Sequence, residues 1–144
     1  MTERTVRQIV EGQSLATATV DTTVAEAARL MKQRNVGALM VLQGDALVGI
    51  FTERDGLFRV LADGLDPATT GLGAVMTRDP QTIDARSGFT VALQLMHDGR
   101  FRHLPVLEDG RLIGVVSVRD ALGPELEAFV YEMLRQEQFQ QVLA

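Results

Sequence analysis

Apolar positions between residues 24 and 51 follow two different periods. The first apolar residues lie at i, i+3, i+4 and i+7, which places them along one side of a helix: Val24, Ala27, Ala28 and Met31. Two continuous apolar runs follow, at residues 38–42 and 46–51. The residues between these runs, Gln43-Gly44-Asp45, have the composition of a tight hairpin turn. The pattern predicts a helix followed by a β-hairpin.

The same pattern returns 65 residues further along the chain, and the two copies align without a gap. The shift places Leu30-Met31 on Leu95-Met96 and Arg54-Asp55 on Arg119-Asp120. The second set of helical positions is Phe89, Ala92, Leu93 and Met96, and the second pair of apolar runs covers residues 103–107 and 112–118. A repeat at one fixed offset indicates a structural unit that occurs twice.

Each unit has further elements at its two ends. A short extended piece at Thr17-Ala18 or Thr82-Ile83 precedes the helix, and a second helix starts at Thr52 or Ser117. The predicted order is therefore β-α-β-β-α, a mixed α/β (α+β) fold. One unit of about 60 residues would be marginally stable alone, so we expect the two units to pack together around a pseudo-two-fold axis.

The chain divides into residues 1–65, residues 66–123 and a tail of residues 124–144. Gly123-Pro124 separates the tail from the repeat, and proline suits the first turn of a new helix. The apolar tail residues at helical spacing are Leu126, Phe129, Val130, Met133 and Leu134. This stripe either docks on its own module or forms a dimer interface, and the sequence leaves both open.

Composition narrows the class of protein. The chain has 46% hydrophobic residues, 23% charged residues and a formal net charge of −5, as in a globular protein without a global field for nucleic acid. The absence of cysteine excludes disulfides, thiolate nucleophiles and zinc–sulfur sites. No apolar run approaches the roughly 18 residues of a membrane span, and residues 1–4 do not resemble a signal peptide. We therefore expect a cytoplasmic protein.

The sharpest chemical motif ends the last strand of each unit, at residues 49–55 and 114–120. Both copies read Gly, an apolar residue, any residue, Thr or Ser, two further residues and Asp. The carboxylate lies one helical turn after the hydroxyl, on the same face. Such an Asp can accept two hydrogen bonds from a vicinal diol such as that of ribose. Free N–H groups at the helix start, and the adjoining Arg54 or Arg119, favour phosphate.

The same residues also have a purely structural interpretation. Thr52 with Asp55, and Ser117 with Asp120, have the spacing of ordinary helix caps. The glycine at a fixed distance, the neighbouring arginine and the duplication in register favour the ligand interpretation.

The repeat, its order and its doubled motif resemble the cystathionine-β-synthase (CBS) domain over about Val6 to Leu122. The resemblance implies a stand-alone protein of bacterial type whose domain pair forms a disc called a Bateman module. It also implies that Thr or Ser and Asp hold the ribose of an adenine nucleotide. Residues on the first strand and before the second strand would then surround the adenine and the phosphates.

Carried over by position, the resemblance gives two sites that face a shared cleft. The first comprises Thr17, Ala18, Ala38, Thr52, Arg54 and Asp55. The second comprises Thr82, Ile83, Arg102, His103, Pro105, Ser117, Arg119 and Asp120. The counterpart of Arg102-His103 is the uncharged pair Gly37-Ala38, so we expect the second site to offer the richer phosphate environment.

The expected function is a non-catalytic regulatory module that binds AMP, ADP, ATP or NAD(H) and acts on an unidentified protein partner in trans. The sequence contains no phosphate loop, nucleophile elbow or metal-ligand cluster. A structural or interaction scaffold without a ligand, and a module that binds S-adenosylmethionine, are alternatives. A homodimer is expected because the apolar stripes at Met31, at Met96 and in the tail must be covered.

Overall fold

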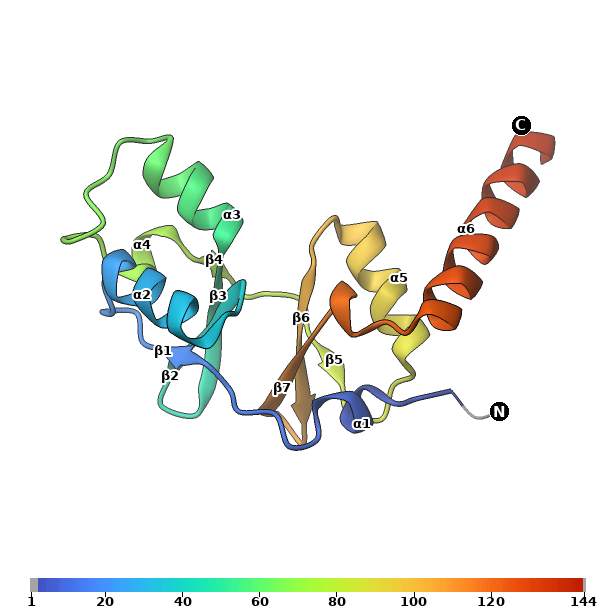
Figure 1. The fold of residues 1–144 in the computed structure, drawn as a ribbon, viewed down its shortest axis with the longest axis horizontal. Helices are drawn as coiled ribbons and strands as arrows, with labels where there is room; N and C mark the ends of the chain where they lie inside the picture. Colours follow the sequence, from blue (N-terminus) through green and yellow to red (C-terminus); the bar gives the residue numbers. More distant parts are fainter. Residues whose placement is uncertain (1–2, 144) are drawn as a thin grey trace.

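Two β-sheets, one from each repeat, organise the fold (Figure 1). The structure is a computed structural model that describes residues 3–143. The first sheet has the order β1 (Thr17–Ala18), β2 (Ala38–Gln43), β3 (Ala46–Thr52) and β4 (Thr77–Arg78). The second has the order β5 (Ile83–Asp84), β6 (His103–Glu108) and β7 (Arg111–Ser117). In both sheets the short first strand runs parallel to the next one, which forms the predicted antiparallel hairpin with the third.

The two predicted helices before the hairpins are confirmed as α2 (Val24–Arg34) and α5 (Phe89–Gly99). Their buried residues are Val24, Ala27, Met31, Phe89, Ala92, Leu93 and Met96. Ala28, which the spacing also placed on the apolar stripe, is exposed. The Thr23 hydroxyl accepts a hydrogen bond from the Glu26 N–H at 3.2 Å and caps α2, whereas Gly88 precedes α5 without a side-chain cap.

The second helix of the unit differs between the repeats. In the first repeat α3 (Glu53–Asp55) continues as a π-helix, η1 (Gly56–Leu61). In the second, the predicted helix is reduced to one 3₁₀ turn, η2 (Val118–Asp120). Pro124 stands 65 residues after Arg59. It has no N–H to donate to the Asp120 carbonyl, and its ring would clash with that carbonyl in a continuous helix.

The core of each repeat includes a short helix from the part of the chain assigned to the other repeat. α1 (Val6–Val10) packs into the core of the second repeat, and α4 (Leu72–Val75) packs into that of the first. A Cβ atom on Gly114 would collide with Val10, and one on Gly49 would collide with Met76. The glycine of each motif therefore lets a crossing segment lie directly on the strand.

The two sheets meet in a third apolar cluster. Ala38, Met40 and Ile50 of the first repeat are buried there, and Leu112 and Val115 of the second pack against them. Equivalent elements thus face each other across one interface, as the predicted pseudo-two-fold arrangement requires.

The tail forms α6 (Gly123–Leu143), which starts on α5 and projects away from the rest of the molecule (Figure 1). Phe129 packs against the second core, with its ring 5.9 Å from that of His97. Further along, Leu134 and Phe139 are exposed. Among the described residues, no helix is long and apolar enough to cross a membrane.

Candidate functional site

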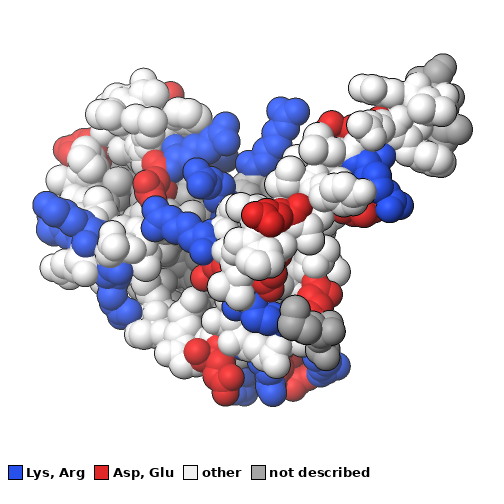
Figure 2. All heavy atoms as spheres, turned by 45° about the vertical axis from the view of Figure 1, so that its right-hand side comes forward, with Lys and Arg blue, Asp and Glu red and all other residues white. Residues whose placement is uncertain are grey.

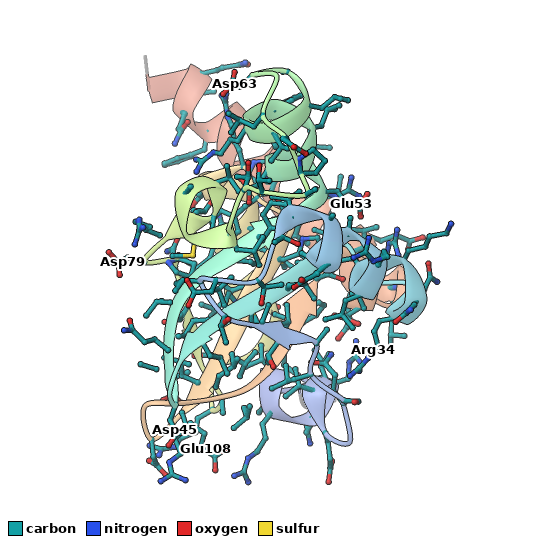
Figure 3. The ribbon with its side chains drawn as sticks, turned by 90° about the vertical axis from the view of Figure 1, so that its left-hand side faces the viewer. Arg34, Asp45, Glu53, Asp63, Asp79 and Glu108 are labelled. Carbon is teal, nitrogen blue, oxygen red and sulfur yellow. The ribbon has the colours of Figure 1, made fainter. Side chains whose placement is uncertain are left out.

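The strand ends that carry the motifs border one cavity of about 760 Å3. The hairpin turns next to Asp45 and Glu108 lie together at the opposite end of the sheets, whereas Glu53 lies well away from them (Figure 3). Thr52 at the end of β3, Ser117 at the end of β7 and His103 at the start of β6 all line the cavity. The cavity is therefore built jointly by the two repeats.

Half of the predicted site residues line this cavity. They are Thr52, Arg54, Asp55, Arg102, His103, Ser117 and Arg119. The carboxylate of the first predicted site thus shares a cavity with the Arg102-His103 pair that was assigned to the second. Asp55 and the start of β6, with Arg102 and His103, therefore line one composite cavity.

The other predicted residues lie outside the cavity lining: Thr17, Ala18, Ala38, Thr82, Ile83, Pro105 and Asp120. Ala38 is buried in the cluster between the sheets, and Ile83 is buried in the second core. Pro105 pairs with Val115 in the middle of its hairpin and is fully buried. Ligand contacts by these seven residues stay a prediction.

Further lining residues were not predicted from the sequence. They are Gly37, Ile50, Glu53, Phe58, Arg59, Thr77, Pro80, Gln81, Arg100, Phe101 and Val118. Arg59 follows Asp55 by four residues, so helical spacing alone indicated that the two side chains are neighbours. Thr77, Pro80 and Gln81 come from the segment between the repeats, and no periodic pattern pointed to them.

The two oxygens of the Asp55 carboxylate have different partners. Oδ2 accepts hydrogen bonds from the Thr52 N–H at 3.0 Å and from the Thr52 hydroxyl at 3.1 Å. The Asp55 N–H in turn donates to Thr52 Oγ1 at 3.2 Å, which completes a capping box. Oδ1 accepts a hydrogen bond from the Thr77 hydroxyl at 3.3 Å and lies 3.5 Å from Arg59 Nε. One oxygen caps the helix, and the other is directed outside its own turn.

The Asp120 carboxylate is less engaged. Its Oδ2 accepts a hydrogen bond from the Ser117 N–H at 2.7 Å, the counterpart of the Thr52 bond. The Asp120 carbonyl oxygen, left free where the helix stops, accepts a hydrogen bond from the Arg4 guanidinium at 2.9 Å. Arg4 also forms an ion pair with Glu125 in the first turn of α6, so it connects the N-terminal segment to the end of the second motif.

The cavity is strongly cationic. Five guanidinium groups line it, against the two carboxylates of Glu53 and Asp55: Arg54, Arg59, Arg100, Arg102 and Arg119. Figure 2 shows basic side chains gathered around the hollow between the two halves of the molecule. Guanidinium groups bind phosphate oxygens in pairs. The lining therefore has the chemistry of a receptor for an organic phosphate.

His103 lies among these arginines, on the wall of the cavity. Burial lowers the pKa of His103 below its ordinary value of 6.5, Arg102 and Arg119 lower it further, and Glu53 opposes the shift. His103 is therefore neutral at pH 7 and can still donate or accept a hydrogen bond. A Cβ atom on Gly37 would collide with the Glu53 carboxylate and touch His103, so glycine allows these side chains to approach the strand start.

A protein-family comparison identifies the class of this paired module. The model of the CBS domain family matches residues 6–61 and 72–124, more than half of the chain. The chain therefore belongs to the CBS domain family, and its two domains form the paired regulatory unit of that family. The resemblance seen in the sequence is confirmed.

Individual relatives agree with this assignment. The chain is 40% identical over 109 residues to the mitochondrial CBS domain-containing protein CBSX3 of Arabidopsis thaliana, which covers 72% of this chain. The chain spans about half of that relative, 53% of its length. A solved structure of a protein with CBS domains from Burkholderia ambifaria is 34% identical, with a TM-score of 0.77 over 81% of this chain and 90% of that one.

A more distant structure has the same fold. The CBS domain protein PAE2072 from Pyrobaculum aerophilum, solved in complex with AMP, covers 89% of this chain and 99% of its own, with a TM-score of 0.79 at 22% identity.

Proposed function

We propose that the chain is a sensor that binds an adenine nucleotide in the composite cavity and acts on a cytoplasmic protein partner in trans, without catalysing a reaction. The observation that carries this proposal is the position of Asp55, a carboxylate suited to the ribose diol, in the same cavity as five guanidinium groups. The fold of the Pyrobaculum protein accommodates AMP, which supports the same ligand class here.

The arrangement of the lining suggests how such a ligand lies. The ribose diol donates to Asp55 Oδ1, since Oδ2 already caps the helix. The phosphates extend toward Arg102 and Arg119 on the second repeat. AMP, ADP, ATP and NAD(H) all carry the diol and the phosphate that this arrangement requires. S-adenosylmethionine fits less well, because its sulfonium cation would enter a cavity that is already cationic.

A structural scaffold without a ligand is the competing function. The complete capping box at Asp55 favours it, because a cap alone explains why threonine and aspartate occur at this spacing. The cap does not explain the arginines, whose like charges repel one another in a cavity without an anion.

We also propose that the module forms a homodimer. Leu57 and Leu61 on η1 are exposed, and an apolar groove of about 590 Å3 runs between α2 and η1. A second copy that covers this face in a symmetric interface removes the apolar surface from water on both chains.

Isothermal calorimetry tests the sensor function. We expect heat with AMP, ADP, ATP or NAD(H), weaker binding of ribose-free adenine, and no product after prolonged incubation. Arg102→Ala should weaken nucleotide binding, whereas Arg111→Ala, an exposed arginine outside the cavity, is the matched control. Absence of heat with every adenine nucleotide would leave the scaffold as the function.

A further inference from the structure

The segment between the repeats is tied to the candidate ligand carboxylate. We call residues 72–78, which comprise α4 and β4, the connector. Thr77 of the connector donates its hydroxyl hydrogen bond to Asp55 Oδ1 at 3.3 Å. Arg59 contacts both the same oxygen and the connector. Its Nε lies 3.5 Å from Asp55 Oδ1, and its Nη1 donates a hydrogen bond to the Met76 carbonyl at 2.9 Å. Asp55, Arg59 and Thr77 thus form one set of contacts, named here the Asp55–connector contacts.

The Asp55 carboxylate has no acceptor position to spare for a ribose. A carboxylate offers about four positions for donors. Within the described part of the chain, three hydrogen bonds and one ion pair occupy them. A vicinal diol that binds Asp55 must therefore displace existing partners.

The partners on Oδ1 are the ones that a ligand can displace. Those on Oδ2 come from Thr52 and hold the helix start, and their distances of 3.0 and 3.1 Å are shorter. The Arg59 side chain is 50% exposed, so it can turn toward solvent or phosphate at little cost. An ion pair this exposed contributes little on its own.

We propose that ligand binding at Asp55 breaks the Asp55–connector contacts and so signals occupancy through the connector. This inference rests on the proposed nucleotide site. The diol takes Oδ1, Thr77 and Arg59 leave it, and the freed guanidinium remains on the wall of a cavity that holds the phosphates. Because the connector completes the first core and leads directly into β5, its release changes how the two repeats are joined.

The second repeat has no such contacts. The position equivalent to Arg59 is Pro124, and the position equivalent to Thr77 is Gly12; neither has a side-chain donor. Among residues 3–143, the hydrogen bond to the Asp120 carboxylate comes from the Ser117 N–H. A ligand at Asp120 would therefore displace nothing, and only the first repeat couples occupancy to the connector.

Hydrogen–deuterium exchange of residues 72–78 tests the contacts, with and without adenosine, which carries the diol but no phosphate. In the ligand-free protein we expect Thr77→Val and Arg59→Gln to speed exchange of the connector by about three- to tenfold, from the loss of one hydrogen bond or exposed ion pair. Saturating adenosine should accelerate exchange in the wild type at least as much as either substitution does. In each variant it should add only a smaller acceleration, because one of the two contacts is already absent.

Calorimetry provides the second measurement. Both variants should bind adenosine about three- to tenfold more tightly than the wild type, because the ligand then displaces one partner of Asp55 Oδ1 instead of two. Arg78→Gln is the matched control: Arg78 donates to the connector carbonyl of Gly73 at 2.7 Å without touching Asp55. It is expected to loosen the connector and leave the affinity for adenosine unchanged.

The outcomes separate this inference from the proposed function. Wild-type binding with unchanged or weaker adenosine affinity in Thr77→Val and Arg59→Gln would overturn the coupling alone. A wild type that binds no adenine ligand would overturn both. Unchanged ligand-free exchange of residues 72–78 in both variants would show that the contacts do not hold the connector.

Discussion

The two repeats are copies in sequence, yet their motif carboxylates have different roles. Asp55 is 6% exposed, caps a continuous helix and contacts the connector. Asp120 is only half-buried, ends a single 3₁₀ turn and has fewer partners. This difference comes from a few substituted positions, chiefly the one occupied by Arg59 in the first repeat and by Pro124 in the second. It shows that a repeated motif preserves the backbone turn more strictly than the environment of its functional group.

The first repeat has the more deeply buried carboxylate, whereas the second repeat has the more basic strand start. The second repeat has Arg102-His103 at its strand start, whereas the first has Gly37-Ala38. Because equivalent elements face each other across the sheet interface, these charges lie in the cavity of Asp55. One repeat supplies the embedded carboxylate and the other supplies much of the cationic wall, so neither forms this site alone.

The largest difference should follow removal of the two carboxylates. We expect Asp55→Ala to lower the free energy of unfolding by about 1–3 kcal/mol, through the lost cap and the unpaired donors. It should also weaken nucleotide binding more than tenfold. Asp120→Ala should cost about 1 kcal/mol or less, because its side chain is less buried and has fewer partners. Urea unfolding and calorimetry measure both effects, and equal losses for the two variants would show that the repeats do not differ in this way.

The motif glycines provide a second comparison. A Cβ on Gly114 meets the branched side chain of Val10 on α1, whereas a Cβ on Gly49 meets the flexible thioether of Met76. Overpacking costs more where the neighbour cannot move. We expect Gly114→Ala to destabilise by about 1–3 kcal/mol and Gly49→Ala by less. Thermal unfolding monitored by circular dichroism ranks them; the reverse order would mean that α1 shifts more easily than the connector.

Much of this fold was predictable from the sequence because its signals are local and duplicated. The hairpin strands begin and end within one or two residues of the apolar runs, and α2 begins at Val24, the first residue of the predicted helical stripe. Which residues share one site was harder to predict from the sequence. Arg102 was assigned to the second site because residues were carried over copy by copy, but the cavity contains side chains from both copies.

The unpredicted features depend on contacts between distant segments. Arg59 could be placed near Asp55 by helical spacing, but its bond to the Met76 carbonyl depends on α4 crossing onto the first core. Likewise, the shortening of the helix after Ser117 followed from Pro124, a signal present in the sequence that the regularity of the repeat concealed.

Because the basic residues at the strand start lie on the second repeat, we expect their removal to weaken the binding of ligands that carry phosphate and to spare those that do not. Arg102→Ala should weaken AMP binding by about tenfold, within the range of a charged hydrogen bond, and leave adenosine binding unchanged. Arg111→Ala, on the exposed edge of β7, should affect neither. Competition calorimetry with AMP and adenosine makes the comparison. If Arg102→Ala reduced both affinities equally, the guanidinium would support the shape of the cavity and not contact phosphate.

The smallest expected effect is a pH dependence of the free energy of unfolding that comes from the second repeat alone. His103 at the start of β6 titrates, whereas its counterpart in the first repeat, Ala38, does not. Burial lowers the pKa of folded His103 below 6.5, helped by Arg102 and Arg119 and opposed by Glu53. Above pH 6.5 the imidazole is neutral in both the folded and the unfolded chain. Below pH 6.5 the unfolded chain binds the proton first, so the free energy of unfolding falls until the pH passes the lowered pKa of the folded state.

His103→Gln should remove this part of the pH dependence, while His97→Gln, on the exposed side of α5, should retain it. Urea unfolding at a series of pH values below and above 6.5 measures the slope in each variant. Stability that rises as the pH falls through this window in the wild type but not in His103→Gln would show that the carboxylates of Glu53 and Asp120 outweigh burial. The cavity would then hold a charged imidazolium, and its attraction for phosphate would rest on six cations where the present geometry provides five.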